Sequence, residues 1–158
     1  MIKKILSTLI VAFLVTSCGS MTTGVSIGNS DIKSSEIQKS VDEILTARKT
    51  VDTSQMQLES GEDLNRAQMR FHILTELLTE VAAKVKITVS KAEIDTRRAS
   101  ITEQVGGPTG LPKALVGAGI AAKDFDQYLQ GIIIAEKLGQ GLQATGVAAD
   151  QVGAAIQQ

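Results

Sequence analysis

The sequence predicts an all-α fold, a small helical bundle of about four to five helices with a short N-terminal β-strand. Apolar residues recur three and four positions apart over most of the chain, which is the spacing of amphipathic helices. Stretches that contain glycine, proline and small polar residues interrupt this spacing, as expected of the connections between helices. Alternating apolar and polar residues near position 25 indicate the strand. The chain is therefore expected to hold one domain built almost entirely of helices.

The first eighteen residues have the order of a secretory signal peptide. Lys3 and Lys4 precede the apolar stretch Ile5–Val15, and small residues lead from there to Cys18. The apolar stretch is too short to span a bilayer comfortably. The segment resembles the bacterial lipoprotein signal, in which the cysteine is lipid-modified and becomes the mature N-terminus. We expect residues 1–17 to be removed and Cys18 to be lipidated; the alternative is ordinary cleavage that leaves an incidental thiol.

A lipidated Cys18 would anchor the rest of the chain to a membrane. Two acyl chains give firm attachment, whereas one chain gives only marginal binding. Residues 18–23 form a short tether, and because an extended residue spans at most about 3.6 Å, they would hold the domain within roughly 20 Å of the lipid. We therefore expect the protein in the cell envelope, on the extracytoplasmic face of the cell membrane or, in a cell with two membranes, of the outer membrane.

The composition argues against nucleic acid as a partner. The chain of 158 residues has a formal net charge of −1, whereas nucleic-acid binding calls for a concentrated positive surface. Aromatic residues make up 3% of the chain, which leaves few side chains for stacking against bases or sugars. Cys18 is the one cysteine, so core packing rather than an internal disulfide must stabilise the domain.

The first elements after the tether are a strand, a helix and a loop. Residues 24–29 alternate apolar and polar side chains and end on turn-forming residues, as in a short strand. Ser34 is a suitable N-cap for an amphipathic helix over residues 35–51. The polar residues 52–63 lack helical spacing and are interpreted as a loop. The helix has its apolar residues on one side, namely Ile37, Val41, Ile44, Leu45 and Val51.

The central helix, expected over residues 64–85, has apolar residues on two sides. Its main stripe is formed by Leu64, Ala67, Phe71, Leu74, Leu78, Val81, Ala82 and Val85. A narrower stripe on nearly the opposite side is formed by Met69, Ile73 and Leu77. Such a helix is either covered from two directions within the bundle, which is the simpler arrangement, or offers one side to a partner. The narrower stripe supplies our candidate partner-binding residues, since methionine suits an adaptable surface.

The clearest helix start in the chain follows Ser90. Ser90 and Glu93 have the spacing of a capping box, in which each side chain bonds a free amide of the first turn. The helix that begins there carries a thin apolar stripe and stops at the Gly-Gly-Pro sequence of residues 106–108. A short helix over residues 111–118 follows, and Gly119 is a natural cap for its C-terminus.

An amphipathic helix over residues 122–138 completes the predicted domain. Its apolar side is formed by Phe125, Tyr128, Leu129, Ile132 and Ala135. Residues 140–158 form a tail rich in glycine, alanine and glutamine. A weak terminal helix is indicated within that tail by Val147, Val152 and Ile156.

The order of these elements resembles the N-terminal domain of the SurA and PrsA type of exported chaperone and peptidyl-prolyl isomerase. The resembling segments are, in chain order, residues 25–29, 34–45, 74–82, 87–95, 103–107, 115–120 and 124–129. Each motif recurs in many proteins, whereas their order and spacing carry the resemblance. The resemblance implies that residues 24–139 form one SurA N-terminal-like helical domain.

The resemblance also implies a function. In that family the helical domain holds unfolded exported polypeptides, and in the isomerases a parvulin domain follows it. The sequence stops about twenty residues after Leu138, too few for a catalytic domain. We therefore expect a lipid-anchored, chaperone-like protein without isomerase activity, whose clients are unfolded or nascent exported polypeptides contacting Met69, Ile73 and Leu77. A structural or adaptor lipoprotein with one envelope partner is the first alternative, and an isomerase accessory or remnant is the weaker one.

The residues of the chain specify neither an enzyme nor a cofactor or metal site. A metal site needs several converging ligands, whereas His72 is the one histidine and Cys18 is assigned to the lipid. We expect a structural or solvated role for His72. Ser60 and Ser90 lack the Gly-x-Ser-x-Gly frame of a nucleophilic serine. The glycine-rich residues 106–110 lack the Gly-Lys-Ser/Thr of a phosphate-binding loop.

Overall fold

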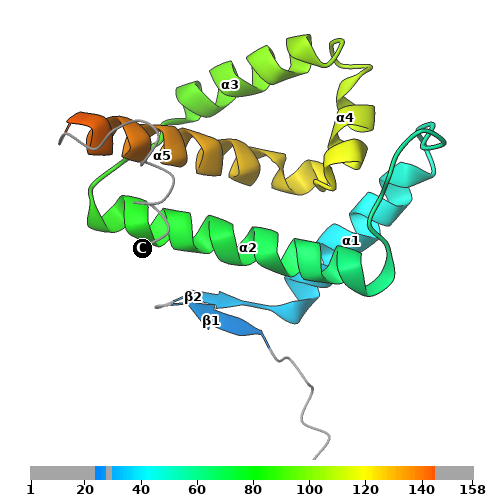
Figure 1. Cartoon of the computed structure of the whole chain (residues 1–158), viewed down its shortest axis with the longest axis horizontal. Coiled ribbons are helices and arrows are strands. Elements are labelled where there is room, and N and C mark those ends of the chain that lie inside the picture. The colour runs from blue at the N-terminus through cyan, green and yellow to red at the C-terminus, as the bar shows by residue number, and fades with distance from the viewer. Residues whose placement is uncertain (1–23, 28–29, 145–158) are drawn as a thin grey trace, which may run out of the picture.

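A computed structural model of the protein describes residues 24–27 and 30–144. Within these residues a two-stranded antiparallel sheet is followed by five α-helices, which confirms the predicted class of a helical bundle with a small β element at its N-terminus. Figure 1 shows the sheet at one edge of the molecule, with helices α2, α5 and α3 placed successively farther from it. Cys18 and the rest of the tether lie outside the described residues.

The N-terminal β element is a hairpin rather than a single strand. Strand β1 (Val25–Ile27) falls within the strand predicted over residues 24–29, and it pairs with β2 (Ser30–Ile32), which the sequence pattern did not indicate. The second strand is too short and too polar to show alternation by itself. It is held by its pairing, including a hydrogen bond of 2.6 Å that the Ser26 hydroxyl donates to Asp31 Oδ1.

Helix α1 (Ser34–Arg48) starts one residue earlier and ends three residues earlier than predicted. Ser34 is its first helical residue, so the prediction that Ser34 is the N-cap is wrong. Lys33 occupies the cap position because it leaves β2 in an extended conformation, and its carbonyl oxygen accepts the Glu36 amide at 2.9 Å. The residues that α1 buries are Ile37, Ser40, Val41 and Ile44.

Helix α2 (Gly61–Lys84) begins three residues before the predicted start and buries a different side from the one expected. Its buried residues are Leu64, Gln68, His72, Thr75 and Ala82. Three members of the predicted main stripe, Leu74, Val81 and Val85, are exposed. The main apolar stripe is therefore only partly buried, and the buried side is centred on polar residues that find partners in neighbouring elements.

The C-terminus of α2 is closed by an unusual cap. Ile87 donates its amide to Ala82 O at 2.8 Å, and Lys86 donates its amide to Ala83 O at 3.3 Å, which is the bond pair of a Schellman motif. The residue in left-handed conformation is Lys86, with a φ of 59°, where glycine is usual. A side chain at this φ stores backbone strain.

Helix α3 (Lys91–Gln104) begins as predicted. The Ser90 hydroxyl accepts the Glu93 amide at 3.3 Å, and Glu93 Oε2 accepts the Ser90 amide at 2.8 Å, so both bonds of the capping box are present. The helix gives way to Gly106 and Gly107, both at positive φ. The predicted stop at residues 106–108 is confirmed.

The last helices follow the prediction closely. Helix α4 (Leu111–Ala118) has the predicted bounds, and Gly119 caps it in the left-handed conformation with a φ of 65°. The helix predicted from residue 122 begins as one 3₁₀ turn, η2 (Ala122–Asp124), and continues as α5 (Phe125–Ala144). Helix α5 thus extends into the segment interpreted as a tail. The predicted weak helix around Val147, Val152 and Ile156 lies outside the described residues.

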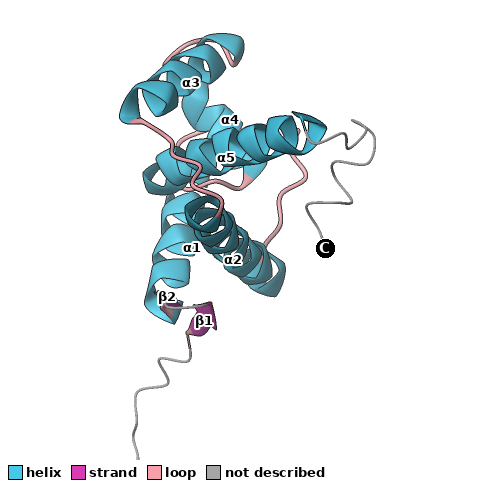
Figure 2. Ribbon diagram, turned by 90° about the vertical axis from the view of Figure 1, so that its left-hand side faces the viewer, coloured by secondary structure: helices cyan, strands magenta, loops and turns pink. Residues whose placement is uncertain are grey.

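Helix α5 lies at the centre of the arrangement. In both Figure 1 and Figure 2, α2 and α3 lie on opposite sides of α5, and the hairpin covers the far side of α2. Helix α1 packs across α2 and also contacts α4 and η2. The core includes two clusters, one of Val41, Ile44, Leu64 and Ala121, and one of Leu115, Phe125 and Leu129. Among the described helices, none combines the length and apolar character needed to cross a membrane.

Candidate functional site

The second half of α2 presents apolar side chains to solvent. Leu74, Leu77, Val81 and Val85 retain between 40% and 58% of their accessible surface. They are spaced three and four positions apart, so they lie on one side of the helix and its C-terminal turn. We call these four residues the α2 apolar row.

A groove between α2 and α5 adjoins this row. It has a volume of about 270 Å³ and an almost entirely apolar lining, formed by Phe71, Leu74, Thr75 and Leu78 of α2 and Tyr128, Gly131, Ile132 and Ala135 of α5. Leu74 belongs to both the groove and the α2 apolar row, so the two form one continuous surface. Gly131 of α5 lies opposite Leu78, since a Cβ at this position would be in van der Waals contact with Leu78 Cδ1 at 3.6 Å.

The three residues predicted to bind a partner do not form one surface. Leu77 is exposed and belongs to the α2 apolar row. Met69 is also exposed, but it lies beside the charged residues Glu59, Asp63, Arg66 and Arg70 in a separate small hollow. Ile73 is half-buried on a helix against which the hairpin packs. The structure thus brings Leu77, from the narrower predicted stripe, together with Leu74, Val81 and Val85 of the main stripe.

Polar residues on the buried side of α2 explain why this row is exposed. Gln68 Nε2 donates to the carbonyl oxygen of Gly119 at 2.8 Å, and the Thr75 hydroxyl donates to Phe71 O at 2.8 Å. Their hydrogen bonds offset the cost of burying polar groups. The spacing of Gln68, His72 and Thr75, four and three positions apart, is the sequence signal that could have revealed this buried side.

The chain matches a family model described as the SurA-like N-terminal domain over residues 1–139. The chain belongs to this family. Searches of curated proteins and of solved structures found no match. Family membership confirms the resemblance inferred from the order of the elements, and it associates this SurA-like domain with a chaperone-like function.

A buried polar cluster joins three elements of the SurA-like domain. We call Ser40, His72, Lys123 and Asp124 the Ser40 cluster. The fully buried Ser40 hydroxyl lies 2.6 Å from Asp124 Oδ2 and 3.0 Å from His72 Nε2. Lys123 Nζ donates to Ser40 Oγ at 2.9 Å and to Asp124 Oδ1 at 2.7 Å. The cluster ties α1, α2 and η2 together.

The protonation of His72 follows from these contacts. The single proton of the Ser40 hydroxyl goes to Asp124 Oδ2, its shortest contact, so Ser40 Oγ accepts from both Lys123 Nζ and His72 Nε2. A neutral His72 therefore carries its proton on Nε2. Burial lowers the pKa of His72 below its usual value of 6.5, and the charge of Asp124 partly opposes this shift.

Serine, histidine and aspartate are all present in the Ser40 cluster, but their arrangement is not that of a hydrolase. In a catalytic triad the carboxylate orients the histidine, which in turn removes the serine proton. Here Asp124 bonds to Ser40 instead, and Ser40 has no surface open to a substrate. The contacts indicate a structural role. Within the described part of the chain, no three His, Cys, Asp or Glu side chains are grouped as metal ligands would be.

Proposed function

We propose that this SurA-like domain binds apolar segments of unfolded, newly exported polypeptides through the α2–α5 groove and the α2 apolar row. The observation that carries the proposal is the continuous apolar surface that α2 and α5 leave uncovered. Contiguous exposed apolar surface marks interaction sites in soluble domains. Apolar contact is non-directional and is proportional to the area covered, so one surface can accept many sequences.

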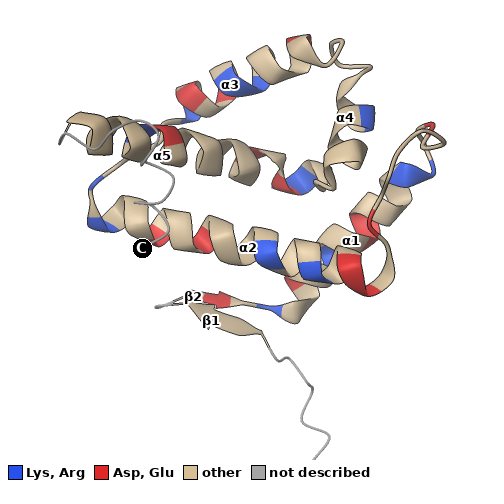
Figure 3. Ribbon diagram, in the orientation of Figure 1, with Lys and Arg blue, Asp and Glu red and all other residues tan. Residues whose placement is uncertain are grey.

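Charge would contribute little to client selection at this surface. Basic and acidic residues both occur along α2 (Figure 3), with Arg70 and Lys84 of one sign and Glu76 and Glu80 of the other. Mixed charges at the edge of an apolar surface keep it soluble without favouring clients of one sign. The proposal assigns no catalytic step and no cofactor to the domain.

Client binding is tested by suppression of aggregation. The protein beginning at residue 18, with Cys18→Ser to prevent lipidation, should slow the aggregation of an unfolded polypeptide. Leu74→Gln should weaken binding about tenfold, because fully covering a leucine is worth about 1.5–3 kcal/mol and Leu74 has 58% of its surface left for a client to cover. Leu45→Gln is the matched control, since Leu45 is also exposed but lies on α1, away from the groove. The proposal would be contradicted if both variants lost client binding equally, or if the parent protein did not suppress aggregation.

The adaptor alternative makes a different prediction about partners. Burial of Met69, Ile73 and Leu77 together would favour this alternative, whereas Met69 and Leu77 are exposed, which supports the client-binding proposal. A photoreactive residue at position 74 in intact cells would discriminate further. Many nascent exported chains should be captured if the domain is a chaperone, whereas one reproducible partner would identify an adaptor.

We also propose that Cys18 anchors the domain to a membrane, after removal of residues 1–17. The order of charged, apolar and small residues before Cys18 supports this proposal. A tether of residues 18–23 would place the groove close to the surface from which exported chains emerge. Mass spectrometry of the N-terminal peptide should find acyl chains on Cys18 in the membrane fraction. An unmodified Cys18 in protein released to the medium would overturn the proposal.

A further inference from the structure

Helix α3 is the least buried helix of the domain. None of the described residues of α3 is buried, whereas each of the other four helices buries at least two. Its main packing partner is α5, and it lies on the side of α5 away from α2 (Figures 1 and 2). The apolar side chains that α3 contributes to the core are Ile94 and Ile101, both half-buried. A helix with so little buried apolar surface is held weakly by packing.

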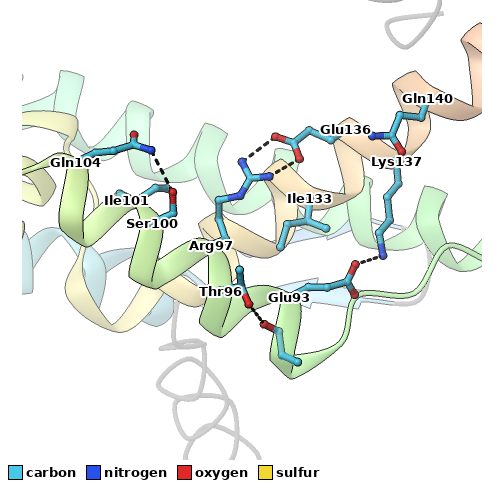
Figure 4. A pocket seen from close by; sticks show the side chains of 11 residues that line it. Glu93, Thr96, Arg97, Ser100, Ile101, Gln104, Ile133, Glu136, Lys137 and Gln140 are labelled. Carbon is cyan, nitrogen blue, oxygen red and sulfur yellow. Dashed lines mark hydrogen bonds and ion pairs between the residues drawn. The ribbon is translucent and has the colours of Figure 1, made fainter.

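Ion pairs supply much of the contact between α3 and α5. Arg97 bonds both carboxylate oxygens of Glu136, and Glu93 pairs with Lys137 (Figure 4). Arg98 pairs with Asp126 and lies 5.4 Å from the centre of the Phe125 ring. Hydrogen bonds from Lys137 and Ser90 lower the pKa of Glu93 to about 2.

These ion pairs are sensitive to salt because their side chains are 31% to 57% exposed. Partly exposed pairs lose strength as dissolved ions screen them. Two of these pairs, Arg97–Glu136 and Glu93–Lys137, also line a cleft of about 840 Å³ between α3 and α5. Figure 4 shows Arg97 and Glu136 meeting across this cleft, with Ile133 between the two ion pairs. Helix α3 thus covers α5 without filling the space between them.

The connections at the two ends of α3 contain residues at positive φ. Lys86 lies before the helix at a φ of 59°, and Gly106 and Gly107 follow it at 93° and 77°. Short connections of this kind are where hinges absorb backbone rotation. Beneath α3 lies the apolar cluster of Leu115, Phe125 and Leu129, which Ile94 and Ile101 cover. Movement of α3 away from α5 would expose that cluster.

We propose that α3 is a salt-sensitive lid, latched to α5 by the Arg97–Glu136, Arg98–Asp126 and Glu93–Lys137 pairs. The lid opens by rotation at two hinges, residues 85–90 and residues 105–110, when dissolved ions screen those pairs. Opening uncovers Leu115, Phe125 and Leu129, and this gives clients a second apolar surface. The use by clients rests on the proposed function, whereas the opening of the lid does not.

Hydrogen–deuterium exchange of the full chain tests the lid without any client. The exchange of residues 91–104 is compared with that of α2 in about 0.01 M and about 1 M salt, between which the Debye length falls from roughly 30 Å to roughly 3 Å. We expect α3 to exchange at least about threefold faster at high salt, with α2 unchanged. Equal protection of α3 at both salt concentrations overturns the proposal.

Variants that reverse the charges of the Arg97–Glu136 pair provide a matched comparison. Arg97→Glu should speed exchange of α3 already at low salt, and the pair Arg97→Glu with Glu136→Arg should restore protection. Lys91→Gln is the control, because Lys91 pairs with Asp95 within α3 and does not reach α5. If Lys91→Gln speeds the hydrogen–deuterium exchange of α3 as much as Arg97→Glu does, the proposal of a latch is also contradicted. If Arg97→Glu unfolds the whole domain, α2 loses protection as well, and the salt series on the unmodified chain decides.

Discussion

Leu129→Ala is expected to lower the free energy of unfolding by about 2–5 kcal/mol, the range for leucine-to-alanine changes in packed cores. Leu129 has 0% of its surface exposed and packs with Leu115 and Phe125 near the N-terminal end of α5. The substitution removes the transfer free energy of the side chain and leaves a cavity that the surrounding residues of α3 and α4 can only partly fill. Since a domain of this size is stable by about 5–15 kcal/mol, a large share of its stability would be lost. Chemical denaturation measures the effect.

Leu77→Ala is the matched control for this change. It has the same chemistry on α2, but Leu77 is 42% exposed in the α2 apolar row. We expect Leu77→Ala to lower the free energy of unfolding by less than about 1 kcal/mol, because removing a partly exposed side chain leaves little cavity behind. Equal costs for the two substitutions would show that the α2 apolar row is packed inside the protein in solution. The assignment of this row as an open surface would then be wrong.

Asp124→Ala is expected to lower the free energy of unfolding by about 2–3 kcal/mol, which is what a hydrogen bond to a buried charged group contributes. Asp124 is buried and accepts hydrogen bonds from the Ser40 hydroxyl and from Lys123 Nζ. The substitution removes the closest acceptor of the buried Ser40 hydroxyl and leaves it the more distant carbonyl oxygen of Glu36, at 3.2 Å. Lys123 is 37% exposed on its side chain and can turn to solvent, which limits the loss. Thermal or denaturant unfolding would measure it.

A double-mutant cycle separates the Ser40 cluster from a general effect of losing a charge. Removing both partners of a buried hydrogen bond costs less than leaving one unsatisfied, so Ser40→Ala with Asp124→Ala should cost less than the sum of the two single changes. Asp95→Ala, which breaks a surface ion pair with Lys91, should change stability by no more than about 0.5 kcal/mol. If the two single substitutions at Ser40 and Asp124 changed the free energy of unfolding additively, these residues would not be energetically coupled.

The local structure of the domain was largely predictable from the sequence. The capping box of Ser90 and Glu93, the glycine stop after α3 and the Gly119 cap of α4 all appear where their residues predict them. Each depends on hydrogen bonds and backbone preferences within about five residues, so neighbours along the chain contain the necessary information. Strand β2 was missed because its pairing partner, rather than its own composition, makes it a strand.

The candidate site was less predictable. Helical spacing indicated that α2 has more apolar surface than one neighbour could cover, but it did not show that Leu74, Val81 and Val85 would be the exposed part. The sequence does not show that Gln68 would meet Gly119, or that His72 would meet Ser40, across 51 and 32 positions. With these partners, burial of the polar side of α2 becomes favourable, and the apolar row is left in solvent.

Sequence alone determined the helical class, most helix ends and the family of the domain, because these features depend on short-range order and spacing. The tertiary structure alone decided which side of α2 is open, how Ser40, His72 and Asp124 converge, and how weakly α3 is attached to α5. Burial and pairing depend on which distant segments meet, and a buried polar side chain is stable only where such a segment supplies its hydrogen-bond partner.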